Sequence, residues 1–189
     1  MEFRVIIDCG ITVQAVIPRF FHKEFFLSGD NMAAEDSQFQ LVTFKLGEEL
    51  YGVNIMDVKE ILRQQNVRII PNAPYYVEGI INVRGEIIPI IDLHKRFRLQ
   101  ASSTVDQDGL EGGFIILDID GSKVGIIIDK VERVVTVNQG DVKEPPQMLS
   151  GIGSEYIEGV IRQEVGYLIV LNIRKVFNPK ELQKIIEIQ

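Results

Sequence analysis

A hairpin-like stretch occurs twice in this 189-residue chain, and the repetition limits the folds that the chain can adopt. The first copy of the stretch is GIINVRGEIIPIIDL, residues 79–93, and its positions return 80 residues later without a gap. The recurring positions are Tyr76/Tyr156, Glu78/Glu158, Gly79/Gly159, Ile81/Ile161, Lys95/Lys175 and Phe97/Phe177, with Asp92 answered by Asn172. An upstream piece recurs at an offset of 73, as Gly52/Gly125, Val53/Ile126, Ile55/Ile128, Val58/Val131, Ile61/Val134 and Leu62/Val135. Two pieces that recur in the same order indicate an internal duplication.

The stretch itself predicts a β-hairpin. Two apolar runs, 80–83 and 87–91, flank a glycine-containing turn at 84–86, which is the pattern of two strands joined tightly. Pro89 has no amide hydrogen, so we expect the second run to meet solvent, a bulge or a sheet edge there. Asp92 should then cap a short helical turn.

Further strands and two helices are expected around this hairpin. The first copy spans about 39–98 and the second about 113–177, and the other predicted strands are 40–46, 50–55, 114–119, 123–129, 131–137, 157–161 and 167–171. The segment 56–62 fits either a helical turn or a strand. Pro74 is placed to start one helical turn that ends at Gly79, and Pro179 to start a C-terminal helix, 179–188.

Composition narrows the class of protein. Each copy, at roughly 60–70 residues, would bury too little apolar surface alone, so the two copies should pack together. The net charge of −7, with no Lys/Arg stripe, disfavours nucleic acid. Cys9 is the single cysteine, which excludes an internal disulfide and fits a reducing compartment. No apolar run approaches the roughly 18 residues needed to cross a bilayer, so direct membrane insertion is not expected.

Residues 1–36 lie outside the duplicated pattern and form an N-terminal extension. They contain a strand-like run at 5–7 and a phenylalanine cluster at 20–26 with helical spacing. One hypothesis is that the native chain starts at Met32, so that residues 1–31 are a leader or a non-native addition and not part of the fold. The alternative is an extra helix docked on the duplicated units or on a partner. A native protein whose intact mass includes residues 1–31 would exclude the first hypothesis.

The sequence gives little support to catalysis, metal binding or a cofactor. His22, His94 and Cys9 are far apart and have no zinc-binding spacing, and no phosphate-binding or dinucleotide-binding motif is present. His94 follows Asp92 by two residues, but no nucleophile stands in a recognisable motif. We therefore expect His94 to be an exposed residue of the short helix, and an enzyme is the weaker hypothesis.

The two copies differ at the hairpin turn. Asn82, Val83, Arg84 and Gly85 in the first copy correspond to Arg162, Gln163, Glu164 and Val165 in the second. A duplicated scaffold needs its turn in both copies but does not need the same charge there. Arg84 is therefore either a fork for a partner's carboxylate or a solvated arginine. Glu60 is either a solvated strand residue, which we favour, or the charged rim of an apolar groove.

These motifs resemble a known family. The string GIINVRGEIIPIIDL, preceded by FKLGEELYGVNIMDVKEIL and PNAPYYVEG, resembles the CheW family of bacterial chemotaxis coupling proteins over residues 39 to 177. The resemblance implies an all-β fold of two SH3-like five-stranded β-barrels packed side by side, with short helices and a C-terminal helix. These barrels would be two intertwined subdomains of one CheW-like domain, 37–189.

The resemblance also implies a function. Members of the family are non-enzymatic adaptors that couple the cytoplasmic hairpin of methyl-accepting chemoreceptors to the regulatory, CheW-like domain of the histidine kinase CheA. They need no cofactor, and they work in the cytoplasm, at receptor arrays on the inner face of the membrane. The competing hypothesis is a small-molecule-binding or enzymatic double β-barrel with a site between the barrels, which predicts a polar pocket around His94 or clustered acids.

The resemblance places seven residues in partner-binding surfaces. They are Val58, Glu60, Ile61, Gly79, Arg84, Gly125 and Val134. Arg84 matches the family's turn arginine, which contacts the receptor. The segment 58–61 matches one that lines partner surfaces, with Gly79 in the first barrel, and Gly125 and Val134 in the second, near the groove between the barrels.

Overall fold

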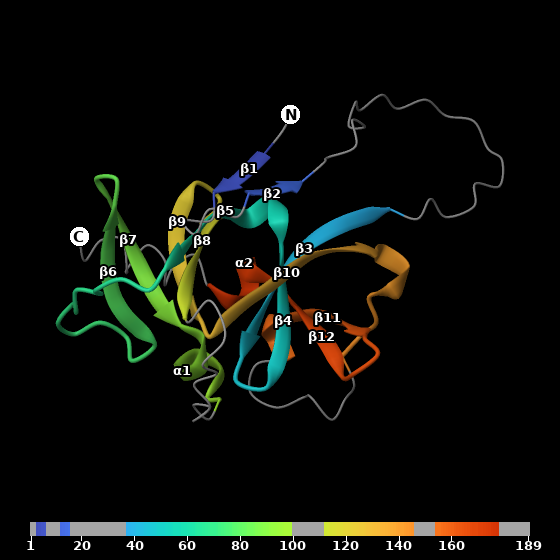
Figure 1. Cartoon of the computed structure of the whole chain (residues 1–189). Helices are drawn as coiled ribbons and strands as arrows, with labels where there is room; N and C mark the ends of the chain where they lie inside the picture. The colour runs from blue at the N-terminus through green and yellow to red at the C-terminus, as the bar shows by residue number, and fades with distance from the viewer. Residues whose placement is uncertain (1–2, 7–11, 16–36, 100–111, 146–153, 178–189) are drawn as a thin grey trace, which may run out of the picture.

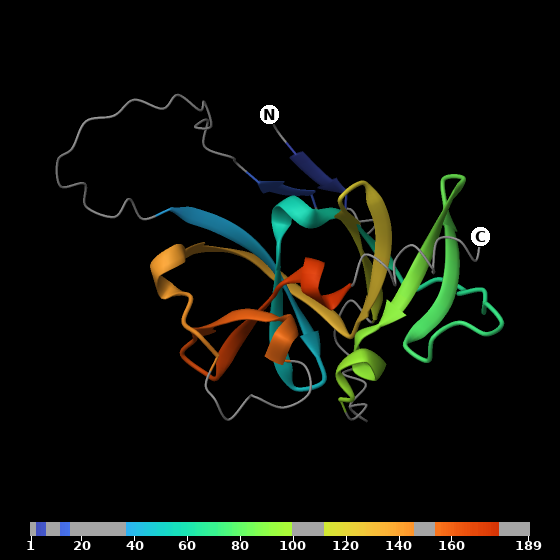
Figure 2. The ribbon, with the colours of Figure 1, turned by 180° about the vertical axis from the view of Figure 1, so that it is seen from behind.

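The protein is built from β-strands arranged in two five-stranded sheets. The computed structural model describes residues 3–6, 12–15, 37–99, 112–145 and 154–177. The two sheets lie side by side, and the view from behind shows the same arrangement (Figures 1 and 2). A separate hairpin pairs β1 (Phe3–Ile6) with β2 (Thr12–Ala15). The predicted all-β fold class is thereby confirmed.

Equivalent strands of the two copies, β3 to β7 and β8 to β12, follow the same order in the two sheets. The first sheet has the order β10-β3-β4-β12-β11, and the second has the order β5-β8-β9-β7-β6. The strands of the first sheet are β3 (Gln38–Leu46), β4 (Glu49–Asn54), β10 (Lys130–Asn138), β11 (Ile157–Arg162) and β12 (Tyr167–Leu171). Those of the second are β5 (Val58–Arg63), β6 (Val77–Val83), β7 (Glu86–Asp92), β8 (Gly113–Ile119) and β9 (Ser122–Ile128). Within each sheet, only β4 with β12 and β7 with β9 pair in parallel.

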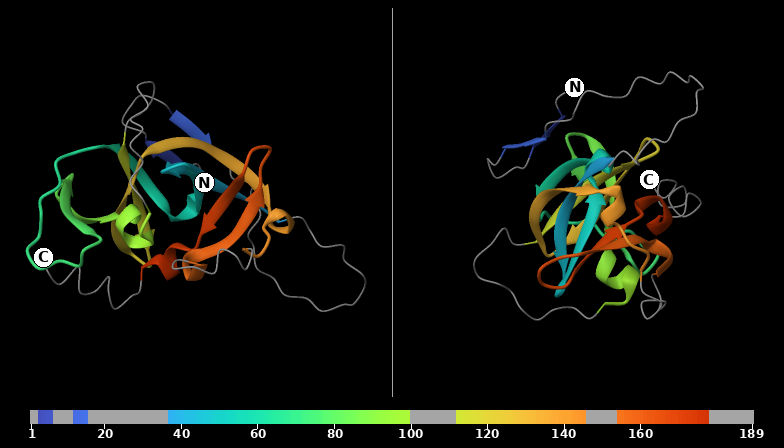
Figure 3. Two further views of the ribbon diagram at one scale, coloured as in Figure 1. Left: turned by 90° about the horizontal axis from the view of Figure 1, so that it is seen from below. Right: turned by 90° about the vertical axis from the view of Figure 1, so that its right-hand side faces the viewer.

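The two copies of the duplication exchange strands. The first copy supplies β3 to β7 and the second supplies β8 to β12, yet each sheet contains two strands of one copy and three of the other. The chain leaves the first sheet through the 3₁₀ turn η1 (Ile55–Asp57) and returns to it between β9 and β10. Figure 3 shows the two barrels from below, with β10 passing over to the side of β11 and β12. Consequently, neither copy supplies all five strands of either sheet.

The short helices and turns follow the local sequence. Helix α1 (Leu93–Phe97) begins after Asp92, whose Oδ1 accepts a hydrogen bond from the Lys95 amide at 3.2 Å. Helix α2 (Ile173–Val176) repeats this cap with Asn172. Two further 3₁₀ turns are η2 (Gln139–Asp141) and η4 (Ser154–Tyr156). The predicted cap at Asp92 is confirmed, whereas the helix 179–188 and the phenylalanine cluster 20–26 lie outside the described residues.

Three local expectations are resolved or corrected. The segment 56–62 is a strand preceded by η1, and a bulge between Val58 and Glu60 adjusts its register. The helical turn expected after Pro74 is wrong, because the Pro74 carbonyl closes a single turn with the Val77 amide at 2.8 Å and β6 begins there. Pro89 is buried and not at a sheet edge, and of the expected alternatives the bulge fits, because the register of β6 on β7 shifts between Val77 and Gly79, beside the pair of Ile80 with Pro89. Pro89 also lies just before Ile90, the first residue of β7 that pairs with β9. Its missing amide hydrogen therefore does not interrupt that ladder.

The hydrophobic core has three parts. A small cluster fills each sheet's own interior, and a larger cluster draws residues from both sheets. The shared cluster includes Phe44 and Val53 from the first sheet and Ile91 and Ile126 from the second. Because most of the buried apolar area joins the two sheets, each barrel depends on the other for stability.

A cation and aromatic rings join the two copies beside α1. The Arg96 guanidinium lies 4.4 Å from the ring centroid of Tyr76 and 5.3 Å from that of Tyr156, which occupy equivalent positions in the two copies. Arg96 also donates a hydrogen bond to the Val176 carbonyl at 3.1 Å. Phe97 stacks between Tyr51 and Tyr156. These contacts fix the orientation of the two barrels.

Candidate partner-binding site

The turn between β6 and β7 holds Arg84 at a fixed place. Val83 pairs with Glu86, so Arg84 and Gly85 alone form the loop, with φ values of 52° and 91°. Two positive φ angles match a type I′ turn, whose twist suits the two strands that it joins. The Gly85 amide donates to Asn82 Oδ1 at 2.9 Å and closes the turn further. The Arg84 side chain, 71% exposed, is thus presented to solvent from a rigid backbone.

The equivalent turn of the other sheet is longer and carries no arginine. Arg162 pairs with Tyr167, so four residues form this loop, which a hydrogen bond from the Gln163 amide to the Gly166 carbonyl closes at 3.2 Å. Val165 at its tip is almost fully exposed. The two barrels therefore present different chemistry at equivalent tips: one carries an arginine, and the other carries Glu164 and an exposed valine.

Glu60 lies beside Arg84 and is not a freely solvated strand residue. Arg84 Nη2 donates to Glu60 Oε1 at 2.7 Å, and the Glu60 side chain is only 17% exposed. Glu60 is on β5 and Arg84 follows β6, which are the two outer strands of the second sheet. The sheet is therefore curled enough for its opposite edges to meet at this ion pair. The expectation that Glu60 is solvated is wrong. Its partner Arg84 lies at the opposite edge of the sheet, and only the curvature of the folded sheet brings the two side chains together.

Gly79 and Gly125 belong to the row of residues that leads across the sheet to Glu60. Neighbouring strands place Gly79 opposite Ile90, Ile90 opposite Gly125, Gly125 opposite Ile116, and Ile116 opposite Glu60. A Cβ on Gly125 would lie 2.4 Å from Ile90 Cδ1, and one on Gly79 would lie 2.2 Å from the Arg68 carbonyl oxygen. Both positions therefore need glycine for close packing inside the sheet.

The structure corrects where these residues lie. Gly79 and Gly125 share the second sheet instead of lying in different barrels, because the copies exchange strands. Val58 and Ile61 are buried in the shared core, and Val134 of the first sheet packs against that core. Val58 and Ile61 flank Glu60 along β5, whereas Val134 lies on the outer strand β10 of the other sheet. Their role in partner binding stays a prediction.

Sequence reasoning missed an exposed apolar residue next to the arginine. Ile87 lies opposite Asn82 at the start of β7 and is about half exposed. The sequence shows Ile87 as part of a continuous apolar run, which cannot distinguish a buried isoleucine from a solvent-facing one. The change along β7 from the exposed Glu86 and Ile87 to the buried Ile88 appears only in the structure.

His94 is partly buried and holds turns together. Its side chain is 15% exposed, its Nε2 lies 3.1 Å from Asp129 Oδ2, and its Nδ1 lies 3.7 Å from Asp92 Oδ1. Asp129 Oδ2 also accepts a hydrogen bond from the Gly47 amide at 2.6 Å. The expected exposure of His94 is therefore wrong, because α1 packs against the turns after β3 and after β9. These contacts give His94 a structural role.

Groups with shifted pKa values are spread over turns and core. Burial, with a smaller contribution from Glu49, raises the pKa of Tyr51 to about 12. The Gly121 amide, which donates to Asp118 at 2.8 Å, holds the pKa of that carboxyl below its usual value, and Lys59 acts in the same direction. Burial raises the pKa of Asp57. Asp57 and Asp118 lie near each other, where Arg174 pairs with Asp57 and Lys59 pairs with Asp118, while Tyr51 belongs to the core.

The described residues also offer no metal or membrane-spanning element. Within 37–99, 112–145 and 154–177, no group of three His, Cys, Asp or Glu side chains is arranged to hold a metal ion. None of the helices in the described part of the chain is long and apolar enough to cross a membrane. Two barrels with one shared core, and with different chemistry at their solvent-facing turns, define a double-barrel scaffold.

Comparison with known proteins identifies the family. A family model described as CheW-like domain matches residues 40–181. The chain is 61% identical to a chemotaxis protein CheW of Treponema pallidum over 154 residues, which cover 82% of this chain and 91% of that protein. It is 31% identical to a chemotaxis protein CheW of Klebsiella aerogenes, covering 80% and 89% of the two chains. The crystal structure of the scaffolding protein TtCheW from Thermoanaerobacter tengcongensis matches with a TM-score of 0.68 and 31% identity, covering 81% of this chain and 96% of that one.

The chain belongs to the CheW family, and its role is that of an adaptor in chemotaxis signalling. A small-molecule-binding or enzymatic double barrel with a site between the barrels is not favoured by these matches.

Proposed function

We propose that this chain binds the cytoplasmic hairpin of methyl-accepting chemoreceptors and the regulatory domain of the histidine kinase CheA at the same time. It would do so in the cytoplasm, at receptor arrays on the inner face of the membrane, without catalysing a reaction. Membership of the CheW family and the two unlike barrel tips support this proposal. The observation that carries it is the exposed arginine held on a rigid turn in one barrel only.

The proposed mechanism is thermodynamic linkage. A protein that binds two partners couples them when binding of one changes the free energy of binding the other. The exchanged strands and the shared core make the two barrels one stiff body, so a partner on one barrel fixes the orientation of a partner on the other. Receptor state can then bias kinase state without any chemical step in this chain.

In this proposal Arg84 recognises an acidic side chain of the receptor. A guanidinium has five N–H donors, and the bond to Glu60 uses only part of them. Glu60 also holds the guanidinium in place, so less side-chain entropy is lost when a second carboxylate binds. Ile87, half exposed beside the turn, would supply apolar contact area. Val58, Ile61, Gly79 and Gly125 would act by supporting this surface, whereas Val134 lies in the other sheet.

The test is co-sedimentation of the full chain with a receptor cytoplasmic fragment and with the kinase regulatory domain, separately and together. We expect binding to each partner alone, and a ternary complex in which receptor and kinase domain are retained together only when this chain is present. Retention of neither partner, or mutual exclusion of the two, would contradict the proposal.

A further inference from the structure

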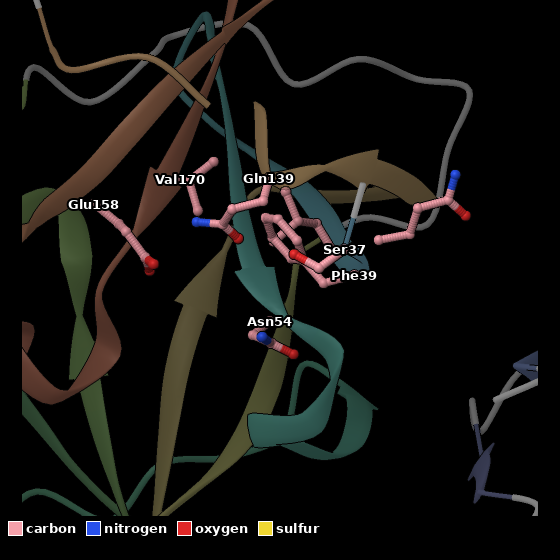
Figure 4. Close-up of a pocket in the computed structure, with 8 residues that line it drawn as sticks. Ser37, Phe39, Asn54, Gln139, Glu158 and Val170 are labelled. Atoms are coloured by element: carbon pink, nitrogen blue, oxygen red, sulfur yellow. The ribbon is translucent and has the colours of Figure 1, made fainter. Parts of the chain in front are cut away.

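A small cavity opens at one end of the first barrel. Its volume is about 180 Å³, and strands β3, β4, β11 and β12 with turn η2 contribute to its lining. Figure 4 shows Glu158, Gln139 and Ser37 around this space, with Asn54 below them and its oxygen directed away from Glu158. The apolar part of the lining includes Phe39 and Leu41, and the polar part is formed by Ser37, Asn54, Gln139 and Glu158.

The other barrel shows what the glutamate of this cavity can bind. Glu78 occupies the position in the first copy that Glu158 occupies in the second. The Lys95 ammonium donates a hydrogen bond to the Glu78 carboxylate and lies 3.5 Å from Asp92 Oδ2. The hydrogen bond to Glu78 is the main cause of a raised pKa at Lys95, so the cation is favoured there. In the second barrel, this glutamate therefore binds a primary ammonium that the chain itself supplies.

In the described part of the first barrel, no cation of the chain takes the equivalent place. Asn172 replaces Asp92, so the carboxylate that helps to hold the lysine is missing. Among the residues that the structure describes, Glu158 forms no ion pair, although Lys175 stands at the position equivalent to Lys95. The carboxylate of Glu158 borders the cavity instead.

The mouth of this barrel is also more polar than its counterpart. Asn54 lies opposite Leu41 in the first sheet, where Ile127 lies opposite Phe114 in the second. Asn54 Oδ1 accepts one hydrogen bond from the Met56 amide at 2.9 Å, which leaves its second lone pair for another donor. Polar side chains therefore line this space in the first barrel. In the second barrel, the position equivalent to Asn54 carries the aliphatic Ile127.

We propose that this cavity binds the ammonium group of a lysine side chain that belongs to a partner protein. The three N–H donors of the ammonium would meet the Glu158 carboxylate, the Gln139 side-chain oxygen and the Ser37 hydroxyl. The methylene stem would pack on Phe39 and Leu41. A water-sized group occupies roughly 30 Å³. The cavity volume of about 180 Å³ therefore has room for the four side-chain carbons and the nitrogen of lysine. Acceptors on several sides suit a compact ammonium better than a planar guanidinium.

The experiment follows the side-chain amide resonances of Asn54 and Gln139 by NMR while the full chain is titrated with Nα-acetyl-lysine methylamide. Parallel titrations use the norleucine analogue, which keeps the stem without the ammonium, and methylammonium, which keeps the charge without the stem. We expect saturable shifts with the lysine probe and binding about fivefold weaker, or weaker still, with either analogue. Equal affinity for norleucine would overturn the ammonium site, and equal affinity for methylammonium would overturn its assignment to a lysine side chain.

Two variants complete the test. Glu158→Gln removes the charge and keeps the shape, and it should weaken the lysine probe about fivefold. Glu155→Gln changes the net charge equally at an exposed position of η4 and should leave the affinity unchanged. Unchanged affinity in Glu158→Gln, with a folded-state spectrum that matches the parent, would overturn the proposal. The result is independent of the proposed coupling function, because the experiment contains neither receptor nor kinase.

Discussion

Arg84 donates a hydrogen bond to Glu60 at 2.7 Å. Glu60 lies on β5 and Arg84 directly follows β6, and these are the two outer strands of one sheet. The contact closes the second barrel at its solvent-facing end. It also gives an exposed arginine a defined direction, which is what recognition of a partner's carboxylate requires.

Charge reversal at the turn should weaken receptor binding. We expect Arg84→Glu to reduce the affinity for a receptor hairpin at least about fivefold, or ~1 kcal/mol, because a carboxylate would replace the donor and repel an acidic partner. Isothermal titration calorimetry with a receptor fragment measures this. Arg162→Glu, at the base of the equivalent turn in the other barrel, is the matched control and should bind normally. An unchanged affinity in Arg84→Glu would remove this residue from the binding surface.

The ion pair itself should contribute little to the stability of the fold. Arg84 is mostly exposed, so solvent screens its interaction with Glu60. A double-mutant cycle with Glu60→Gln and Arg84→Gln, read from urea unfolding, should give a coupling free energy of about 0.2–1 kcal/mol. A much larger coupling energy would mean that the pair holds the barrel together rather than orienting the arginine.

Gly79 should be one of the least replaceable residues. Its φ is 151°, and an added Cβ would lie 2.2 Å from a main-chain oxygen that cannot move aside easily. We expect Gly79→Ala to lower the free energy of unfolding by about 2–3 kcal/mol. Gly140→Ala is the control, since nothing lies within 4 Å of its Cβ position, and it should change stability by less than about 0.5 kcal/mol. Similar urea midpoints for the two variants would contradict this account of the glycine row.

Ionisation of Tyr51 should make the fold less stable in alkali. Its pKa is raised from 10.0 to about 12 by burial, so the folded state holds the phenolic proton more tightly than the unfolded state does. Unfolding then releases a proton between these two values, and stability falls as pH rises from about 10 to about 12. In Tyr51→Phe this part of the decline should be absent from urea unfolding free energies measured across that range. An identical pH dependence in parent and variant would show that the Tyr51 pKa does not differ between the two states.

Strand exchange predicts that the two copies fold only together. Separately produced segments 37–99 and 112–177 should each lack a cooperative thermal transition by circular dichroism, because each supplies only part of either sheet. The mixed segments should recover the transition. Cooperative melting of one segment alone would show that a single copy can form a barrel without its partner strands.

Local elements were predictable from the sequence because their causes are local. The hairpin around the turn at 84–86 and the capped helix after Asp92 depend on neighbouring residues. The exchange of strands between the copies was not visible in the sequence repeat. The repeat shows which positions of the two copies correspond, but not which strands form hydrogen bonds with each other. The parallel contact of β7 with β9 joins distant segments and leaves no local pattern.

The same limit explains the errors at the site. Glu60 and His94 were expected in solvent, and each is held by a residue far away in the chain, Arg84 and Asp129 respectively. Sequence reasoning selected Arg84 by the difference between the copies. It could not separate Val58 and Ile61, which are buried, from the half-exposed Ile87, because the segment 56–62 fits both a helix and a strand and Ile87 lies in a continuous apolar run.

The crossing of the chain between the two sheets has a mechanical consequence. The hydrogen-bond ladder of each sheet contains strands of both copies, so the two copies cannot separate without breaking backbone hydrogen bonds in both sheets. The shared apolar core holds the two barrels against each other, so we expect a displacement at one tip to move both barrels as one body.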